Sequence, residues 1–194
     1  MRKKKKFNST LWMSLFIAFI MVLSILGIMV GETSPSGSKI KYNDFTFFRV
    51  QDGFMTKINK KDVRFSYFPS DLENITIDPA IKDNFNNINM VYLTYNPNQP
   101  AVQAIANVLY SLKPILDDFF NIYSANSMTV NNTYNLPVIT CANATSTVPV
   151  IDFRESNSTQ LLFEDNCIIF EASSASDFVL LKDRLLYSLF GILD

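Results

Sequence analysis

The sequence predicts an α+β or α/β protein with an N-terminal transmembrane helix, a mixed sheet that includes a three-stranded meander, and two main helices. Three observations predict this fold: an uncharged apolar run of 20 residues, a region of alternating aromatic residues, and two later segments with helical spacing. We therefore expect a basic cytoplasmic tail (1–10), a transmembrane helix (11–30), a flexible linker (31–38) and an extracytoplasmic domain (39–194).

The apolar run extends from Leu11 to Val30 and follows the strongly basic start MRKKKKF. A helix of that length reaches about 30 Å, the thickness of the hydrocarbon layer of a bilayer. The positive-inside rule places the N-terminus in the cytoplasm and the C-terminal domain outside a cell membrane that the chain crosses once. A cleaved signal peptide is the alternative, but the run is longer than the typical span of about 7–15 residues and lacks an A-x-A-like end.

The charge of the outer domain excludes one class of partner. From Lys39 onward the chain has 12 basic and 17 acidic residues, a net charge of -5. Such a domain lacks the basic surface that nucleic acids require, so we expect no nucleic-acid partner. The complete absence of histidine also removes the commonest general base and the commonest metal ligand.

The first part of the outer domain, residues 39–68, has the pattern of a three-stranded meander. Aromatic and apolar residues alternate with polar ones, and Asp52-Gly53 is a strong hairpin signal. Two short helical turns follow, for which Ser70 and Asp78 are candidate caps. These features predict the N-terminal part of the sheet.

A strand and a helix come next. NMVYLTY (89–95) is a strand candidate, and NPNQP opens a helix whose apolar positions recur at helical spacing from Ala101 to Phe119. Pro114 should kink or restart that helix. Four short strand candidates follow in LPVITC, VPVIDF, TQLLF and CIIFEA, and the chain closes with an amphipathic helix capped by Ser174 or Ser176. The polar side of this last helix, Lys182 to Arg184, is expected to face solvent.

Cys141 and Cys167 are the only cysteines, and both lie in the part expected outside the cell. A disulfide between them would close a loop of about 27 residues and contribute roughly 3–4 kcal/mol in the loop-entropy model. The alternative is a reactive or metal-binding pair, but a metal site without histidine or further cysteines is poor. We therefore predict a structural disulfide, no metal and no cofactor.

Five N-x-[ST] sequons occur in the chain, and one of them, at Asn8, lies on the expected cytoplasmic side. The four in the outer domain are glycosylation candidates if the host has the enzymes: Asn74, Asn131, Asn143 and Asn157.

Acidic residues are the remaining candidates for chemistry, namely Asp117, Asp118, Asp152, Glu155, Glu164, Asp165 and Glu171. A pair of carboxylates can act as acid and base or hold calcium, but no calcium-loop motif is present. We interpret them as surface charge and assign no catalytic residue.

The order of elements from Asn89 to Leu193 resembles a thioredoxin-like arrangement. TVPVIDF stands where that fold has its cis-proline strand, and KPILDDF is similar to its kinked first helix. NPNQP replaces the C-x-x-C motif, so the resemblance implies a degenerate module without redox activity. The pattern ITCANAT, VPVIDF, DNCIIFEA and DRLLYSLFGI also resembles uncharacterised single-pass membrane proteins of archaea, which have no assigned chemistry.

These observations favour a binding or scaffolding module of the cell envelope over an enzyme. Its expected partners are the lipid bilayer, through residues 11–30, and another envelope protein. The alternative is a carboxylate-dependent hydrolase or ligand receptor with its site in the loops after the strands, near Asn96 or Asp152.

Overall fold

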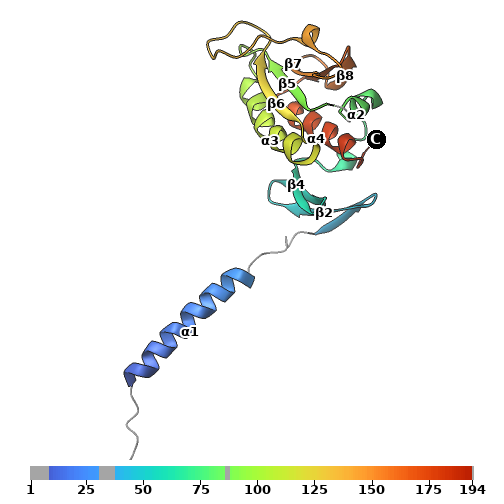
Figure 1. Ribbon diagram of the computed structural model, residues 1–194. Helices are drawn as coiled ribbons and strands as arrows, with labels where there is room; N and C mark the ends of the chain where they lie inside the picture. The colour runs from blue at the N-terminus through green and yellow to red at the C-terminus, as the bar shows by residue number, and fades with distance from the viewer. Residues whose placement is uncertain (1–8, 31–37, 86–87, 194) are drawn as a thin grey trace, which may run out of the picture. The chain divides into compact units, whose positions relative to one another are not determined.

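The computed structural model describes residues 9–30, 38–85 and 88–193. The chain divides into two compact units, Met1–Ser38 and Lys39–Asp194, and the second unit contains both sheets (Figure 1). Over these described residues the protein is a mixed α+β structure with two sheets and four α-helices.

The first unit contains one helix, α1 (Ser9–Val30). Its side chains are described for residues 12–24, and the large apolar ones from Trp12 to Leu23 are 47–66% exposed. Among the described residues, no helix reaches the length and apolarity that a membrane span requires. The transmembrane helix predicted at 11–30 is therefore unsupported by this part of the structure. The basic cluster, Asn8 and most of the predicted linker lie outside the described residues.

The meander forms a sheet of its own with four antiparallel strands, so the prediction of three strands within one mixed sheet was wrong. The additional turn occurs at Asn43, whose φ of 48° places it in the left-handed region that asparagine tolerates. Gly53 forms the predicted hairpin with a φ of 136°, and a Cβ there would overlap the carbonyl oxygen of Phe65. The strands are β1 (Lys39–Tyr42), β2 (Phe45–Val50), β3 (Gly53–Ile58) and β4 (Lys61–Phe65).

The second sheet has five strands in the order β6-β5-β7-β9-β8, and all are parallel except β8. The sequence did not predict β6, and the candidate LPVITC contributes only a single bridge between Val138 and Met128. The strands are β5 (Met90–Tyr95), β6 (Tyr123–Met128), β7 (Val150–Glu155), β8 (Gln160–Glu164) and β9 (Cys167–Ala172).

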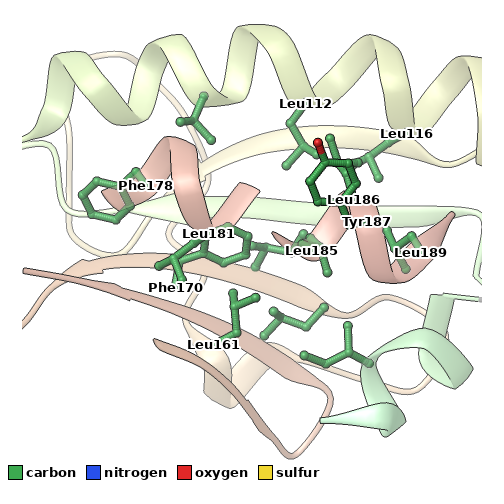
Figure 2. Close-up of a cluster of buried hydrophobic side chains, with 14 of the residues drawn as sticks. Leu112, Leu116, Leu161, Phe170, Phe178, Leu181, Leu185, Leu186, Tyr187 and Leu189 are labelled. Atoms are coloured by element: carbon green, nitrogen blue, oxygen red, sulfur yellow. The ribbon is translucent and has the colours of Figure 1, made fainter. Parts of the chain in front are cut away.

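Two long helices, α3 (Val102–Phe120) and α4 (Asp177–Leu189), cover one face of the five-stranded sheet. Figure 2 shows Leu181 and Leu185 of α4 between the sheet and α3. Helix α3 continues through Pro114 without restarting. A shorter helix, α2 (Pro79–Phe85), and two 3-10 turns, η1 (Pro69–Leu72) and η2 (Cys141–Asn143), complete the domain.

Several predicted caps differ from those observed. Asp78 caps α2 as predicted, since its carboxylate accepts a hydrogen bond from the amide of Ala80. Ser70 lies inside η1 instead of before it. Ser176 occupies the N-cap position of α4, as one of the two predictions had it, but its side chain makes no capping hydrogen bond. The carboxylate of Asp177, the first residue of the helix, accepts a hydrogen bond from the amide of Ser174.

The charged stretch of α4 is buried, contrary to the expectation of a solvated face. Lys182, Asp183 and Arg184 are 5%, 0% and 2% exposed. The second side of α4 is covered by η1 and by the end of the meander, where Asp183 accepts hydrogen bonds from the amides of Ser66 and Tyr67. Helix α4 is therefore a central helix, and the carboxylate of Asp183 joins it to the end of the four-stranded sheet.

The described part of the chain lacks the cis-proline that the thioredoxin-like alternative requires. That alternative required it at the start of the strand that contains VPVIDF. No cis peptide bond occurs in the part of the chain that the structure describes, which includes Pro149. We discard that alternative.

Candidate ligand-binding cleft

The strand order determines where a site can form in this domain. The chain leaves β5, forms α3 on one face of the sheet and returns as β6. It then crosses to the opposite side of β5 to form β7. In open parallel sheets, the place where successive connections diverge in this way is a crevice at the carboxyl ends of the strands, and ligands bind there.

A cleft of about 480 Å³ lies at this position, and we call it the Asp152 cleft. It is formed by the ends of β5, β6 and β7 and by the loop that connects β6 to β7. Its lining residues are Asn96, Gln99, Thr129, Thr140, Asp152, Phe153, Arg154 and Glu155. Its volume is within the range of about 300–1,000 Å³ that is usual for small-ligand sites.

Asp152 is the most unusual residue of the cleft. Its side chain is 3% exposed, and its Oδ2 atom accepts a hydrogen bond of 2.7 Å from Nε of Arg154. Its other oxygen, Oδ1, is buried and has no hydrogen-bond partner among the described residues. Burial raises the pKa of Asp152 above its ordinary value, although the neighbouring Arg154 guanidinium acts in the opposite direction. A buried acceptor without a partner is unfavourable, and in native proteins it often marks a functional site.

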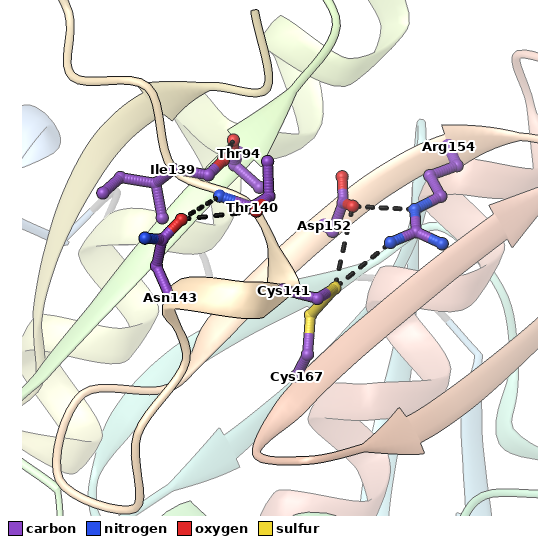
Figure 3. The surroundings of a disulfide bond; sticks show 8 residues. All are labelled: Thr94, Ile139, Thr140, Cys141, Asn143, Asp152, Arg154 and Cys167. Atoms are coloured by element: carbon purple, nitrogen blue, oxygen red, sulfur yellow. Dashed lines mark hydrogen bonds and ion pairs between the residues drawn. A yellow bond between two sulfur atoms is a disulfide. The ribbon is translucent and has the colours of Figure 1, made fainter.

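The disulfide between Cys141 and Cys167 borders this ion pair, as Figure 3 shows. The Nη2 atom of Arg154 lies 3.2 Å from Sγ of Cys141, and Oδ2 of Asp152 lies 3.8 Å from the same sulfur. The bond joins the β6–β7 loop to β9 and so holds this loop over the face of the sheet opposite the long helices. The predicted structural disulfide is thus present, and it also fixes one wall of the candidate site.

A second contact holds the same loop. The hydroxyl of Thr94, on β5, donates a hydrogen bond of 2.7 Å to the carbonyl of Ile139. Thr140, which lines the cleft, follows directly, and both its amide and its hydroxyl bond to Oδ1 of Asn143. The position of Thr140 at the cleft is therefore set by hydrogen bonds on both sides of it.

The opposite wall of the cleft contains polar side chains that hydrogen-bond to the backbone. Gln99 donates to the carbonyl of Phe153 and accepts from the amide of Glu155. The carboxylate of Glu155 accepts a hydrogen bond from the amide of Ala101, immediately before α3. A carboxylate is favourable at a helix N-terminus because the helix dipole is positive there. Gln99 and Glu155 thus position the wall and are less available to a ligand than Asp152.

A second cleft of about 470 Å³ lies nearby, between the ends of β7 and β9. The serine hydroxyls of this cleft are bonded to neighbouring side chains: Ser173 to Asp177, Ser174 to Ser176 and Ser156 to Ser158. Burial alone would raise the pKa of Asp177, but hydrogen bonds from Thr159, Ser173 and Ser174 hold it below its ordinary value. This cleft offers no buried unpartnered group among the described residues, so the Asp152 cleft is the better candidate.

The acidic residues that the sequence offered as candidates lie in different environments in the structure. Asp152 and Glu155 line one cleft, whereas Asp118 forms an exposed ion pair with Lys61 and Glu171 is bonded to Gln160. The interpretation as surface charge was therefore wrong for Asp152. Arg154 was not identified from the sequence, and only its position two residues after Asp152 on the same strand indicated that the two side chains share a face.

The four glycosylation candidates of the outer domain are exposed: Asn74, Asn131, Asn143 and Asn157. Their use stays a prediction. Within the described residues no group of three or more acidic or cysteine side chains could hold a metal ion.

The chain matches no protein-family model, no curated protein and no solved structure. The resemblance to archaeal single-pass membrane proteins therefore stays a prediction.

Proposed function

We propose that the chain is a membrane-anchored, extracytoplasmic binding module of the cell envelope, and that the Asp152 cleft is its ligand site. One observation carries the proposal of the site: a carboxylate oxygen is buried in a cleft at the divergence of the strand connections without a hydrogen-bond partner among the described residues. A ligand that donates a hydrogen bond to Oδ1 of Asp152 would remove the cost of that arrangement.

The geometry supports a receptor better than a hydrolase. A carboxylate-dependent hydrolase needs two carboxyl groups that are both free to act on the substrate. Asp152 and Glu155 line the same cleft, but Glu155 accepts the amide hydrogen bond at the start of α3. The expectation of an envelope protein partner stays a prediction beside the proposed ligand site.

The anchoring part of the proposal rests mainly on the sequence, which is uncharged from Leu11 to Val30 behind five basic residues. The exposed apolar side chains of α1 support it, because contiguous apolar surface of this kind requires either lipid or a protein partner. The described part of the chain contains no helix long and apolar enough to span a membrane, and the side chains of residues 25–30 lie outside that part.

The anchor predicts the behaviour of the full chain in cell membranes. We expect it to stay in the membrane fraction after a carbonate wash at high pH, and we expect external protease to digest the domain from Lys39 onward. An Ile20→Arg substitution should release much of the protein, since an arginine near the centre of a spanning helix costs about 2.5–3.5 kcal/mol. Gln103→Arg, on the polar face of α3, is the matched control and should have no effect. Release of the unaltered chain by the wash would refute the anchor.

The Asp152→Asn substitution should weaken ligand binding without lowering the free energy of unfolding. We expect the free energy of unfolding to stay the same or rise by up to about 1 kcal/mol, because the buried charge is removed and a partly exposed ion pair contributes little. The pKa of Asp152 is raised in the folded state, so its contribution favours folding at low pH and is lost as the pH rises from the ordinary pKa of an aspartate through the folded value. The stability of the unaltered chain relative to the variant should therefore fall over that interval. Chemical unfolding followed at several pH values measures this.

The binding part of the same prediction uses a panel of small probes: acetate, phosphate, ethylammonium, acetamide and D-glucose. At least one should bind the full chain, as measured by saturation-transfer NMR, and Asp152→Asn should weaken that binding about tenfold or more. If the variant were instead less stable by more than about 2 kcal/mol, Asp152 would be a structural residue and the proposed site would be wrong.

A further inference from the structure

We propose that the Asp152 cleft binds a neutral polyhydroxy ligand, a sugar, through the unpaired oxygen of Asp152 and the guanidinium of Arg154. This inference rests on the proposed binding function and specifies the class of ligand.

The free capacity of the cleft consists of an acceptor beside a donor. Oδ1 of Asp152 accepts no hydrogen bond from the described residues. Arg154 directs Nε to Asp152 and Nη2 to the sulfur of Cys141, but its side chain is 44% exposed and its planar group carries five N–H donors. Gln99 and Glu155 are committed to backbone groups, as described above. A ligand must therefore present a donor to Asp152 and an acceptor to Arg154 at neighbouring positions.

The charge of the lining disfavours ionic ligands. Asp152 and Arg154 cancel, and Glu155 adds one negative charge, while the other lining residues are neutral. An anion would approach two carboxylates and a guanidinium that is already paired. A cation would approach that guanidinium, and no group of acidic side chains sufficient for a metal ion occurs in the described part of the chain. A neutral ligand avoids both repulsions.

Neighbouring hydroxyl groups fit this combination. Each hydroxyl donates one hydrogen bond and accepts others, so one hydroxyl of a sugar can donate to Oδ1 of Asp152 while the adjacent one accepts from Arg154. The rest of the lining is consistent, because it includes Thr129, Thr140 and Asn96, which carry hydroxyl and carboxamide groups. Hydrogen bonds to charged groups are also the stronger ones, at about 1.5–3 kcal/mol each, so two such contacts suffice for weak but specific binding.

The test compares three neutral monosaccharides, D-glucose, D-galactose and D-mannose, with acetate, phosphate, ethylammonium and acetamide. The full chain is held in a polyoxyethylene detergent, since alkyl glycosides would themselves supply sugar. Binding is measured by saturation-transfer NMR and by equilibrium dialysis. The proteins are the unaltered chain, Asp152→Asn, Arg154→Gln and the matched control Asp118→Asn, whose carboxylate lies in an exposed ion pair outside the cleft.

We expect at least one monosaccharide to bind the unaltered chain and the control equally, and both cleft variants to bind it about tenfold more weakly or worse, which corresponds to a loss of 1.4 kcal/mol or more. Binding of sugars that Asp152→Asn leaves unchanged would overturn the inference. Dependence on Asp152 for acetate, phosphate, ethylammonium or acetamide, with no sugar bound, would overturn the ligand class but keep the binding function. Binding of no probe at all would overturn both.

Discussion

Replacing Cys141 and Cys167 together by alanine is expected to lower the free energy of unfolding by about 3–4 kcal/mol. The two residues are 26 positions apart, and in the loop-entropy model a cross-link over that length restricts the unfolded chain to this extent. Cys167 is fully buried, and with Val150 and Ile169 it forms the small apolar cluster on the face of the sheet opposite the long helices. Urea unfolding of the full chain, followed by circular dichroism, measures the loss.

The same variant should also affect the cleft. Without the bond, the loop that carries Thr140 is held mainly by the hydrogen bond from Thr94 to Ile139 and by the bridge to β6. Amide hydrogen exchange should therefore increase from 138 to 144 while α3 and α4 stay protected. The unaltered protein under reducing conditions is the control, and it should reproduce both changes. Unchanged stability and unchanged exchange would contradict the role of the disulfide as a clamp on the cleft wall.

The second large effect is expected at Asp183, where alanine should cost about 3–5 kcal/mol. Its Oδ2 atom accepts hydrogen bonds of 2.7 and 3.0 Å from the amides of Ser66 and Tyr67, at the end of the meander. Its Oδ1 atom lies 2.7 Å from Nζ of the buried Lys182, close enough for an ion pair although not aligned as a hydrogen bond. Removal of the carboxylate leaves two amides and one ammonium group without their acceptor.

Asp118→Ala provides the matched control for this prediction. Asp118 also pairs with a lysine, Lys61, at 3.2 Å, but both side chains are more than half exposed. Exposed pairs contribute less than about 1 kcal/mol, so the control should be nearly neutral. Asp183→Asn should fall between the two, because it keeps one oxygen acceptor but leaves Lys182 without a counter-charge. Equal costs for Asp183→Ala and Asp118→Ala in urea unfolding would show that the buried contact between α4 and the end of the meander does not stabilise the fold.

Much of the fold follows from local patterns in the sequence. Alternating apolar residues and Asp52-Gly53 predict the hairpins of the meander, and the helical spacing from Ala101 predicts α3. Strand β6 was not predicted, because its sequence YSANSM is polar. In the structure Ser127 is nevertheless fully buried and donates its hydroxyl to the carbonyl of Leu93. A strand whose hydroxyls bond to the backbone of its neighbour needs no apolar pattern, so periodicity does not reveal it.

The charged residues of α4 show a different limit. When the helix is considered alone, a charged run such as Lys182 to Arg184 predicts a face that is exposed to solvent. In the domain the guanidinium of Arg184 donates to the carbonyls of Ile75 and Leu193, which come from segments far apart in the sequence. Charged side chains can be buried where such acceptors are available, and only the tertiary structure shows which carbonyls lie close enough.

The candidate site was only partly predictable for the same reason. Asp152 stands in an apolar strand, which was a local sign that it is buried. Its neighbours in the cleft come from the ends of three parallel strands and a disulfide-bonded loop, and only the strand order brings them together. The loops near Asn96 or Asp152 were predicted as a site only in the alternative hypothesis of a hydrolase or ligand receptor. The pairing of Asp152 with Arg154 and the bordering disulfide depend on the tertiary structure.

An NMR titration of the Asp152 carboxyl carbon in the full chain tests whether this cleft is a ligand site. We expect a pKa above the ordinary aspartate range, since burial disfavours the charge. We also expect that resonance to shift when D-glucose or another bound member of the probe panel is added. An ordinary pKa together with no response to any probe would mean that Asp152 is solvated and that the cleft is not a ligand site.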